Sequence, residues 1–232
     1  MEKKPKILTI EEIEKISNSK EVADLVECIK SLELKTVPIG EGGNAIVYAA
    51  LGTSFDRVCL KKAKDKPQIM YNNIDQEHQF QMMARDAGVR TPFSLISIKT
   101  DEGKYLIMER IEGYSVAEIM EKPELLPKDF DTDAFCNSLD SQIAKMHKKG
   151  IYHRDLHYEN VMIDKEGLPV VIDFGTATEG TGSDFTYEES VSMYDAKKGR
   201  YGLVNGYFKD DLEMVKNIKS NIRNLAFKQN LT

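Results

Sequence analysis

Hydrophobic residues change their spacing along the chain, and the changes divide it into three parts. Between residues 19 and 32 they recur every three or four positions, which is the period of one helix face. From Thr36 to about residue 110, short β-branched runs alternate with glycine-rich or charged turns, as in strands. After Gly113 helical spacing returns. The pattern predicts a helical segment, a β-rich half and a helical half, with the halves meeting near residues 110–114.

Residues 1–35 are predicted to be helical. Thr9 and Glu12 have the spacing of a capping box, in which each side chain satisfies a free amide at a helix start. A second helix is predicted after Ser19. We interpret the segment as an extension that packs on the main domain, and a separate binding module is the alternative.

The β-rich half contains one predicted helix among its strands. Strands are predicted on both sides of a glycine cluster at residues 40–43, then at 57–63, 93–100 and 104–111. The helix covers residues 74–88 and ends at Gly88, a residue type common just after helices.

The helical half is predicted to begin with a long helix over residues 133–150. This helix has one apolar face, formed by Phe135, Leu139, Ile143 and Met146. Two short strands at residues 160–164 and 169–173 and a last helix over 209–227 follow.

Composition and charge narrow the class of protein. The chain has 232 residues, 41% hydrophobic and 30% charged, as in ordinary globular domains. A net charge of −6 gives no electrostatic reason to expect binding to nucleic acid or an anionic membrane. No apolar run is long enough to span a membrane, and the N-terminus does not have the pattern of a secretory signal. Cys28, Cys59 and Cys136 have no metal or redox spacing, which favours reduced thiols in a cytosol-like compartment.

Polar residues with chemical potential follow the strands of the β-rich half. The glycine turn at residues 40–47 would let backbone amides approach phosphate oxygens, although a plain β-turn explains it equally well. Lys61 lies in the next strand, and Glu77 in the following helix has the charge to pair with it. Each feature alone is a weak signal.

The segment from Tyr152 to Asn160 carries the strongest signal. Asp155 can orient a hydroxyl group and accept its proton, and Asn160 can bind Mg²⁺ through its carbonyl oxygen. Asp173 follows a short strand and precedes Phe174 and Gly175. Because Mg²⁺ prefers hard oxygen ligands and keeps waters and phosphates, one aspartate and one asparagine suffice to hold it.

Taken together and in order, these residues resemble the protein-kinase-like superfamily. The resemblance covers roughly residues 36 to 180. It rests on Gly40, Glu41, Gly42, Lys61, Glu77, residues 108–111, residues 153–155, Asn160 and residues 173–175. It implies an α+β, bilobal fold with a β-rich N-lobe at residues 36–110 and a reduced helical C-lobe at 111–232.

The resemblance also implies ATP and Mg²⁺ as cofactors and a role for each matching residue. Asp155 would be the catalytic base, Lys61 would contact the α- and β-phosphates and pair with Glu77, and Asn160 and Asp173 would hold the metal. His153 and Phe174 would be packed supports, and Asp211 or Asp210 would anchor the catalytic-loop backbone or cap a helix. The residues expected around the nucleotide are Gly40, Glu41, Gly42, Gly43, Asn44, Ala45, Val47, Cys59, Lys61, Met108, Glu109, Ile111 and Met162.

Several departures from the family pattern bear on the substrate. His157 stands where serine/threonine kinases carry lysine, which resembles small-molecule kinases and also haspin kinases. Ala45 replaces the third glycine of the turn, and no Ala-Pro-Glu motif follows Gly175. The predicted helix at residues 74–88 resembles that of the RIO and Bud32 kinases, and the compact C-lobe resembles injected bacterial effector kinases.

The sequence therefore predicts a minimal serine/threonine protein kinase that acts on a protein substrate. It is expected to be a cytoplasmic monomer, and an effector translocated into a host cell is one form it could take. A small-molecule kinase and a catalytically inert binding module are the alternatives. Residues 176–194, rich in hydroxyl and acidic groups, are interpreted as a loop that needs no phosphorylation, with phosphate recognition by Arg154 as the alternative.

Overall fold

The computed structural model describes residues 8–9, 38–42, 45–49, 58–64, 72–100, 103–180 and 211–229. The chain divides into two compact units. The first comprises Met1–Met82 and Pro92–Ile111, and the second comprises Met83–Thr91 and Glu112–Thr232. The chain passes from the first unit to the second for the last time between Ile111 and Glu112. This boundary falls where the spacing of hydrophobic residues changes from that of strands to that of helices.

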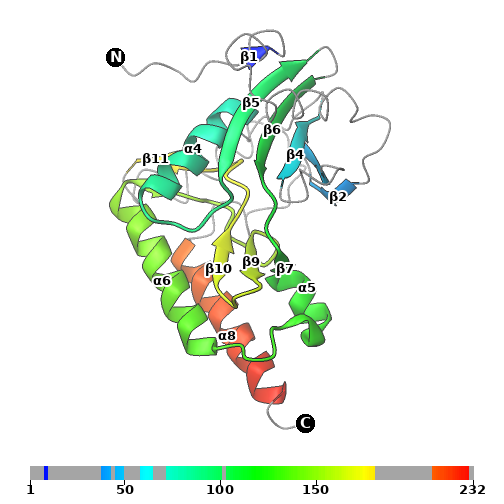
Figure 1. The fold of residues 1–232 in the computed structure, drawn as a ribbon. Helices are drawn as coiled ribbons and strands as arrows, with labels where there is room; N and C mark the ends of the chain where they lie inside the picture. Colours follow the sequence, from blue (N-terminus) through cyan, green and yellow to red (C-terminus); the bar gives the residue numbers. More distant parts are fainter. Residues whose placement is uncertain are drawn as a thin grey trace, which may run out of the picture. The chain divides into compact units, whose positions relative to one another are not determined.

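The first unit is built on a six-stranded sheet with the order β1-β5-β6-β4-β3-β2. The strands are β1 (Leu8–Thr9), β2 (Pro38–Glu41), β3 (Ala45–Ala49), β4 (Val58–Ala63), β5 (Ser94–Thr100) and β6 (Gly103–Glu109). Every pairing is antiparallel except that of β1 with β5. Leu60, Ile98 and Leu106 are fully buried, so β4, β5 and β6, which lie side by side in Figure 1, hold the core of the sheet.

Strand β1 corrects the prediction for the N-terminal segment. Leu8 and Thr9 lie parallel to Ile98 and Lys99 of β5, so the helix predicted over residues 1–35 is wrong at these two positions. Here the edge of β5 offers backbone hydrogen-bonding groups that an extended segment can satisfy, and local helix propensity does not decide the conformation. The other residues of that segment lie outside the described part of the chain.

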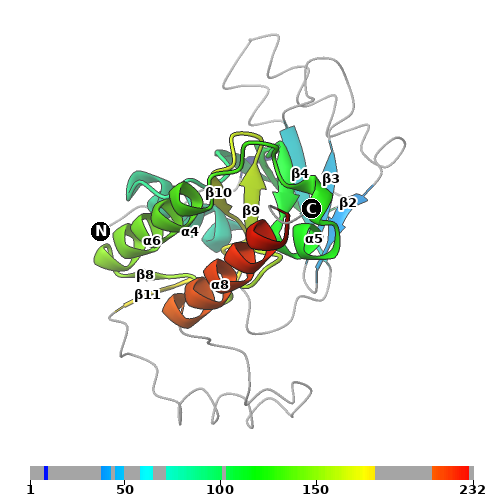
Figure 2. The same ribbon diagram turned by 90° about the horizontal axis from the view of Figure 1, so that it is seen from below.

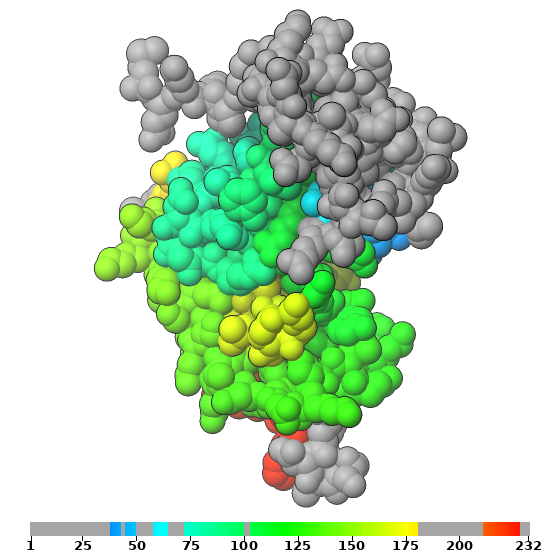
Figure 3. Space-filling model, viewed as in Figure 1, coloured from blue at the N-terminus to red at the C-terminus, as the bar shows by residue number. Residues whose placement is uncertain are grey.

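The second unit combines two small sheets with helices. Strands β7 (Gly113–Ser115), β9 (Val161–Asp164) and β10 (Pro169–Val171) form an antiparallel sheet with the order β10-β9-β7. Strands β8 (Ile151–Tyr152) and β11 (Thr178–Glu179) form the other. The helices are α5 (Val116–Glu121), the 3₁₀ helix η1 (Pro123–Leu125), α6 (Thr132–Lys148) and α8 (Asp211–Gln229). Figure 2 shows α6 and α8 side by side, and the turn between β9 and β10 is exposed (Figure 3, yellow).

Helix α6 forms where the sequence predicts it. Phe135, Leu139, Ile143 and Met146 are all fully buried, which confirms the predicted apolar face. The Asp131 side chain caps the helix by accepting a hydrogen bond from the Ala134 amide at 2.9 Å. A single apolar stripe repeated over several turns is a strong helix signal, because burial of that stripe supplies most of the stability of such a helix.

Helix α4 (Ile74–Asp86) ends as predicted, but the chain after it belongs to the second unit. Gly88 adopts a φ of +91° just beyond the helix, a conformation that glycine adopts without strain. Val89 is buried, and the Arg90 amide donates to Oε1 of Gln142 at 2.8 Å. The Arg90 carbonyl accepts a hydrogen bond from the Val171 amide at 2.9 Å. Residues 83–91 are therefore bonded to both α6 and β10.

Candidate active site

In the first unit, Lys61 and Glu77 form a buried ion pair. Nζ of Lys61 lies 2.6 Å from Oε1 of Glu77, and the two side chains are only 9% and 5% exposed. Lys61 comes from the central strand β4. Glu77 lies in the first turn of α4, which begins with a capping box formed by Asn73 and Gln76. The predicted pairing is present, and its role in holding a nucleotide stays a prediction.

The glycine turn joins β2 to β3, as the sequence predicts. The Gly42 amide donates to the Ala45 carbonyl at 3.0 Å, and Gly43 and Asn44 lie outside the described residues. Lys64, which sequence reasoning missed, donates to Oε1 of Glu41 at 2.7 Å and to the Gly42 carbonyl at 2.8 Å. The Lys64 ammonium group is therefore bonded to the two residues that lead into the turn, Glu41 and Gly42. The only signal in the sequence is the charge of Lys64 at the end of the neighbouring strand.

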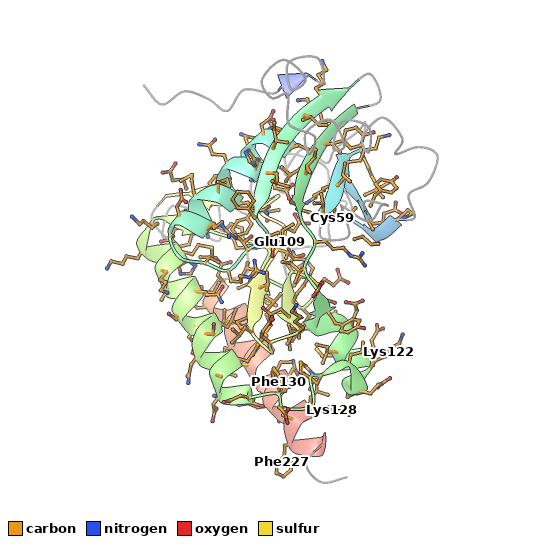
Figure 4. The ribbon with its side chains drawn as sticks, in the orientation of Figure 1. Cys59, Glu109, Lys122, Lys128, Phe130 and Phe227 are labelled. Atoms are coloured by element: carbon orange, nitrogen blue, oxygen red, sulfur yellow. The ribbon has the colours of Figure 1, made fainter. Side chains whose placement is uncertain are left out.

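Cys59 and Glu109, both expected in the nucleotide pocket, lie on the neighbouring strands β4 and β6 (Figure 4). Sγ of Cys59 donates to the Glu109 carbonyl at 3.6 Å, and the cysteine is 4% exposed. Burial raises the pKa of the Cys59 thiol to about 12, although nearby Arg110 and Lys61 oppose the shift. The thiol is therefore protonated at neutral pH, which favours a place in a pocket wall over a nucleophilic role.

The other residues expected at the nucleotide lie in both units. Val47 on β3 is directly opposite Lys61 on β4, and Met108 on β6 is opposite Cys59. Ile111 is the last residue of the first unit. Met162 lies on β9 in the second unit and is half-buried.

In the second unit, residues 155–160 fold into a compact turn. The Asp155 carbonyl accepts hydrogen bonds from the His157 amide at 3.0 Å and from Nδ2 of Asn160 at 2.8 Å. The Asn160 amide donates to the His157 carbonyl at 2.9 Å. These bonds lock the Asn160 side-chain nitrogen toward Asp155, which leaves the carbonyl oxygen of that side chain as the atom suited to a cation.

Asp173 is brought beside this turn by the backbone. The Asn160 carbonyl accepts a hydrogen bond from the Ile172 amide at 2.9 Å, so Asp173 follows directly after a residue bonded to Asn160. Asp173 itself has a φ of +63°, a left-handed conformation that is strained for aspartate, and its Oδ1 accepts the Gly175 amide at 3.2 Å. This turn ends the predicted strand at Val171, two residues early.

The residues present fit a magnesium ion held together with a phosphate ligand. Among the described residues, no group of three or more histidine, cysteine, aspartate and glutamate side chains could hold a metal. Magnesium sites in nucleotide enzymes use one or two protein carboxylates, with waters and phosphate oxygens as the other ligands. Asp173 and Asn160 would supply the hard oxygen atoms of such a site.

His157 is hydrogen-bonded within the turn. Its Nε2 lies 3.5 Å from Oδ2 of Asp155 and 3.0 Å from Nδ2 of Asn160, and its Nδ1 accepts the Glu159 amide at 3.2 Å. Burial lowers the pKa of His157, but the hydrogen bond to Asp155 and the charges of Asp155, Glu159 and Asp173 outweigh it, so the pKa is raised. His157 therefore belongs to the same cluster as Asp155 and Asn160.

Asp211, at the start of α8, holds the chain that leads into the turn. Its Oδ2 accepts the His153 amide at 2.8 Å and its Oδ1 accepts the Arg154 amide at 3.0 Å. Nε2 of His147, a residue that sequence reasoning missed, lies 2.9 Å from Oδ2. Asp211 thus makes the predicted anchor, and Asp210 lies outside the described residues.

His153 and Phe174 occupy packed positions, as expected for supports. His153 is fully buried, and its Nε2 donates to the Ile172 carbonyl at 2.9 Å. The rings of His153 and Phe174 lie 4.9 Å apart. Arg154 is also buried; its guanidinium lies over the Tyr152 ring, and its Nε donates to Oγ1 of Thr178 at 3.1 Å. From residue 181 onward the 176–194 segment lies outside the described residues.

Comparison with known families places most of the chain in one family. The protein kinase domain family matches residues 34–196. The chain belongs to the protein kinase family. This membership also confirms the α+β fold class.

Curated relatives of this kinase are similar over part of their length. A protein named as a probable serine/threonine-protein kinase of Clostridium perfringens is 30% identical over 162 residues, covering 66% of this chain and 22% of the relative. Sperm motility kinase 3A of Mus musculus is 30% identical over 167 residues, covering 72% and 32%. A serine/threonine-protein kinase of Protochlamydia amoebophila is 26% identical over 172 residues, covering 67% and 16%. The kinase spans a third or less of these relatives' lengths.

Proposed function

We propose that this kinase transfers the γ-phosphoryl group of ATP to a serine or threonine hydroxyl of a protein. The observation that carries the proposal is the hydrogen-bonded turn of Asp155 and Asn160 in the second unit, with Asp173 directly after Ile172, whose amide donates to the Asn160 carbonyl. Relatives named as serine/threonine kinases support the acceptor class. Bound ATP with Mg²⁺ would supply the phosphoryl group and neutralise its charge.

Each residue has a distinct part in this proposal. Asp155 would orient the acceptor hydroxyl and take its proton, and the oxygens of Asn160 and Asp173 would hold Mg²⁺. Lys61, kept in place by Glu77, would contact the α- and β-phosphates. The adenine would be lined by Val47, Cys59 and Met162, with Met108 at the back and the backbone of Glu109 and Ile111 at its edge. Backbone amides of residues 40–45 would cover the phosphates.

A small-molecule acceptor remains the second candidate, and His157 favours it. This histidine stands where serine/threonine kinases carry lysine, and it contacts both Asp155 and Asn160.

We infer that this kinase is a cytoplasmic monomer. Its likeness to effector, haspin, RIO and Bud32 kinases stays a prediction. None of the described helices is both long enough and apolar enough to cross a membrane.

The proposal is tested by labelled ATP with the wild-type chain, a panel of proteins and a panel of aminoglycosides, sugars and metabolites. Labelled phosphoserine or phosphothreonine in a protein is expected. Label only in small molecules would favour the second candidate, and nucleotide binding without any transfer would indicate a binding module.

Two variants separate the assigned roles. Asp155→Ala should lower turnover strongly while ATP affinity stays nearly unchanged, and Asp173→Ala should abolish magnesium-dependent binding and turnover. Asp129→Ala, at an exposed position of the second unit, is the control and should behave as wild type. Equal loss of ATP binding in the Asp155 and Asp173 variants would contradict the assignment.

A further inference from the structure

Tyr158 lies in the middle of the turn of residues 155–160, yet it has no part in the proposed chemistry. Its hydroxyl accepts a hydrogen bond from Nδ2 of Asn221 on α8 at 2.8 Å. Its carbonyl accepts a hydrogen bond from the Ala117 amide of α5 at 3.0 Å. Tyr158 therefore connects the turn to two helices that are distant in sequence.

The bond to α5 satisfies one of the amides at the start of that helix. The first four amides of a helix have no acceptor within the helix and need partners from elsewhere. In α5 the Ser115 side chain accepts the Glu118 amide, and the Tyr158 carbonyl accepts the Ala117 amide. Because each bond satisfies a group that is otherwise unpaired, the turn and the helix hold each other in place.

The bond to α8 gives that helix a second contact with the same segment. Asp211 binds the backbone of His153 and Arg154 before the turn, and Asn221 binds Tyr158 within it. Asn221 lies ten positions after Asp211 on the helix, a rise of about 15 Å. A rigid helix that contacts a segment at two separated points resists rotation of that segment as well as its displacement.

The internal hydrogen bonds of the turn do not position it in the unit. The bonds from His157 to Asp155 and from Asn160 to His157 fix its shape only. Its position is set at its ends, by Asp211 before it and by the Ile172 amide on the Asn160 carbonyl after it. Between these ends the Leu156 side chain is fully buried, and Tyr158 adds the hydrogen bonds to α5 and α8.

We propose that Tyr158, through its hydrogen bond to Asn221, is a positioning residue that fixes the orientation of the turn carrying Asp155 and Asn160. The inference rests on the proposed phosphotransfer, because orientation has value only if Asp155 meets an acceptor. Small errors in the placement of reacting groups reduce turnover far more than they reduce binding.

The test compares Tyr158→Phe, which removes only the hydroxyl, with Asn221→Ala and the double variant. For each single variant we expect kcat to fall about three- to tenfold, as for loss of one hydrogen bond, with KM for ATP within about twofold of wild type. The kcat of the double variant should fall no further than that of either single variant, because all three variants lack the same hydrogen bond. Tyr114→Phe and Asn224→Ala, at exposed positions of β7 and α8, are the matched controls.

The outcomes separate positioning from a purely structural role. A lower melting temperature with unchanged kcat of the folded protein would overturn the proposal. A fall in kcat of the Tyr158→Phe variant that Asn221→Ala does not reproduce would also overturn it, because the hydrogen bond would then not be the cause of the fall.

Hydrogen exchange provides a readout that does not need activity. The amides of His157 and Asn160 should exchange faster in Tyr158→Phe than in wild type and in Tyr114→Phe. If the wild type transfers no phosphate, the proposed function fails, and exchange still decides whether Tyr158 holds the turn. Unchanged exchange of these two amides would overturn the proposal that Tyr158 holds the turn in position.

Discussion

At the scale of single residues, the buried charged side chains in the described part of this kinase have partners. Lys61 and Glu77 are the clearest case, because both side chains are almost fully removed from solvent. Removing one partner of such a pair leaves a buried charge uncompensated, whereas replacing both with apolar groups removes the desolvation cost as well.

We therefore predict opposite results from single and double substitutions at this pair. Glu77→Leu should lower the free energy of unfolding by about 3 kcal/mol, because it removes the buried carboxylate that compensates the charge of the Lys61 ammonium. Adding Lys61→Met should restore most of that stability but no phosphotransfer. Urea unfolding and ATP turnover measure the two effects. Glu41→Leu, which breaks the exposed pair with Lys64, is the stability control and should cost less than about 1 kcal/mol. A double variant as unstable as Glu77→Leu would contradict the argument.

Asp211 gives a prediction about pH. Burial raises the pKa of its carboxyl, but the hydrogen bonds and charges of His147 and His153 outweigh burial, so the pKa lies below its ordinary value of 3.8. The unfolded chain then takes up this proton more readily than the folded protein. The contribution to stability is complete above the ordinary value and is lost as the pH falls through the folded pKa.

Substitution should remove this acid-dependent contribution. Asp211→Asn should lower the free energy of unfolding at neutral pH by about 2–4 kcal/mol, because an amide group cannot accept at both of its atoms. As the pH falls from about 5 to about 2, the variant should lose less stability than wild type, as measured by urea unfolding at each pH. Asp129→Asn, an exposed aspartate, should follow the wild-type curve. Parallel curves for wild type and Asp211→Asn would show that Asp211 does not titrate as described.

At the scale of elements, the close pairing of β7 and β9 depends on a glycine. A Cβ added at Gly113 would lie 2.1 Å from the Ile163 carbonyl oxygen, a backbone atom that cannot move aside. Gly113→Ala should therefore separate the strands and lower the free energy of unfolding by about 2–3 kcal/mol. Gly42→Ala is the control, since among the described residues its Cβ would meet no atom closer than 4.0 Å. Urea unfolding of the two variants decides the prediction, and equal stability would refute it.

Elements with a repeated local pattern could be predicted from the sequence. The buried face of α6 follows from four apolar residues at helical spacing, and the end of α4 follows from Gly88. Strand β1 could not be found, because two residues carry no periodic pattern and their partner strand lies about ninety residues later in the chain.

The candidate site shows the same limit. Asp155, Asn160 and Asp173 could be found because their order and spacing repeat a family motif. His147 and Asn221 have no such motif, and their partners Asp211 and Tyr158 lie 64 and 63 residues away. Contacts of this kind arise from tertiary packing, which the order of residues along one chain does not reveal.

At the scale of the whole molecule, residues 83–91 leave the β-rich part of the sequence and belong to the second unit. Gln142 of α6 holds this segment: its Oε1 accepts the Arg90 amide, and its Nε2 donates to the Pro169 carbonyl at 3.0 Å. The Gln142 side chain is buried, so water cannot replace either bond easily.

Loss of the Gln142 amide should therefore loosen residues 83–91 as well as α6. Gln142→Leu should lower the free energy of unfolding by about 2–4 kcal/mol, because it removes the Gln142 acceptor of the Arg90 amide and the Gln142 donor to the Pro169 carbonyl. Hydrogen exchange should accelerate at the Arg90 amide, whose acceptor is lost, and at the Val171 amide, which is bonded to Arg90. Asn137→Leu, an exposed position of the same helix, is the matched control and should change neither quantity. Faster exchange confined to α6, with residues 83–91 as protected as in wild type, would show that this segment is held without Gln142.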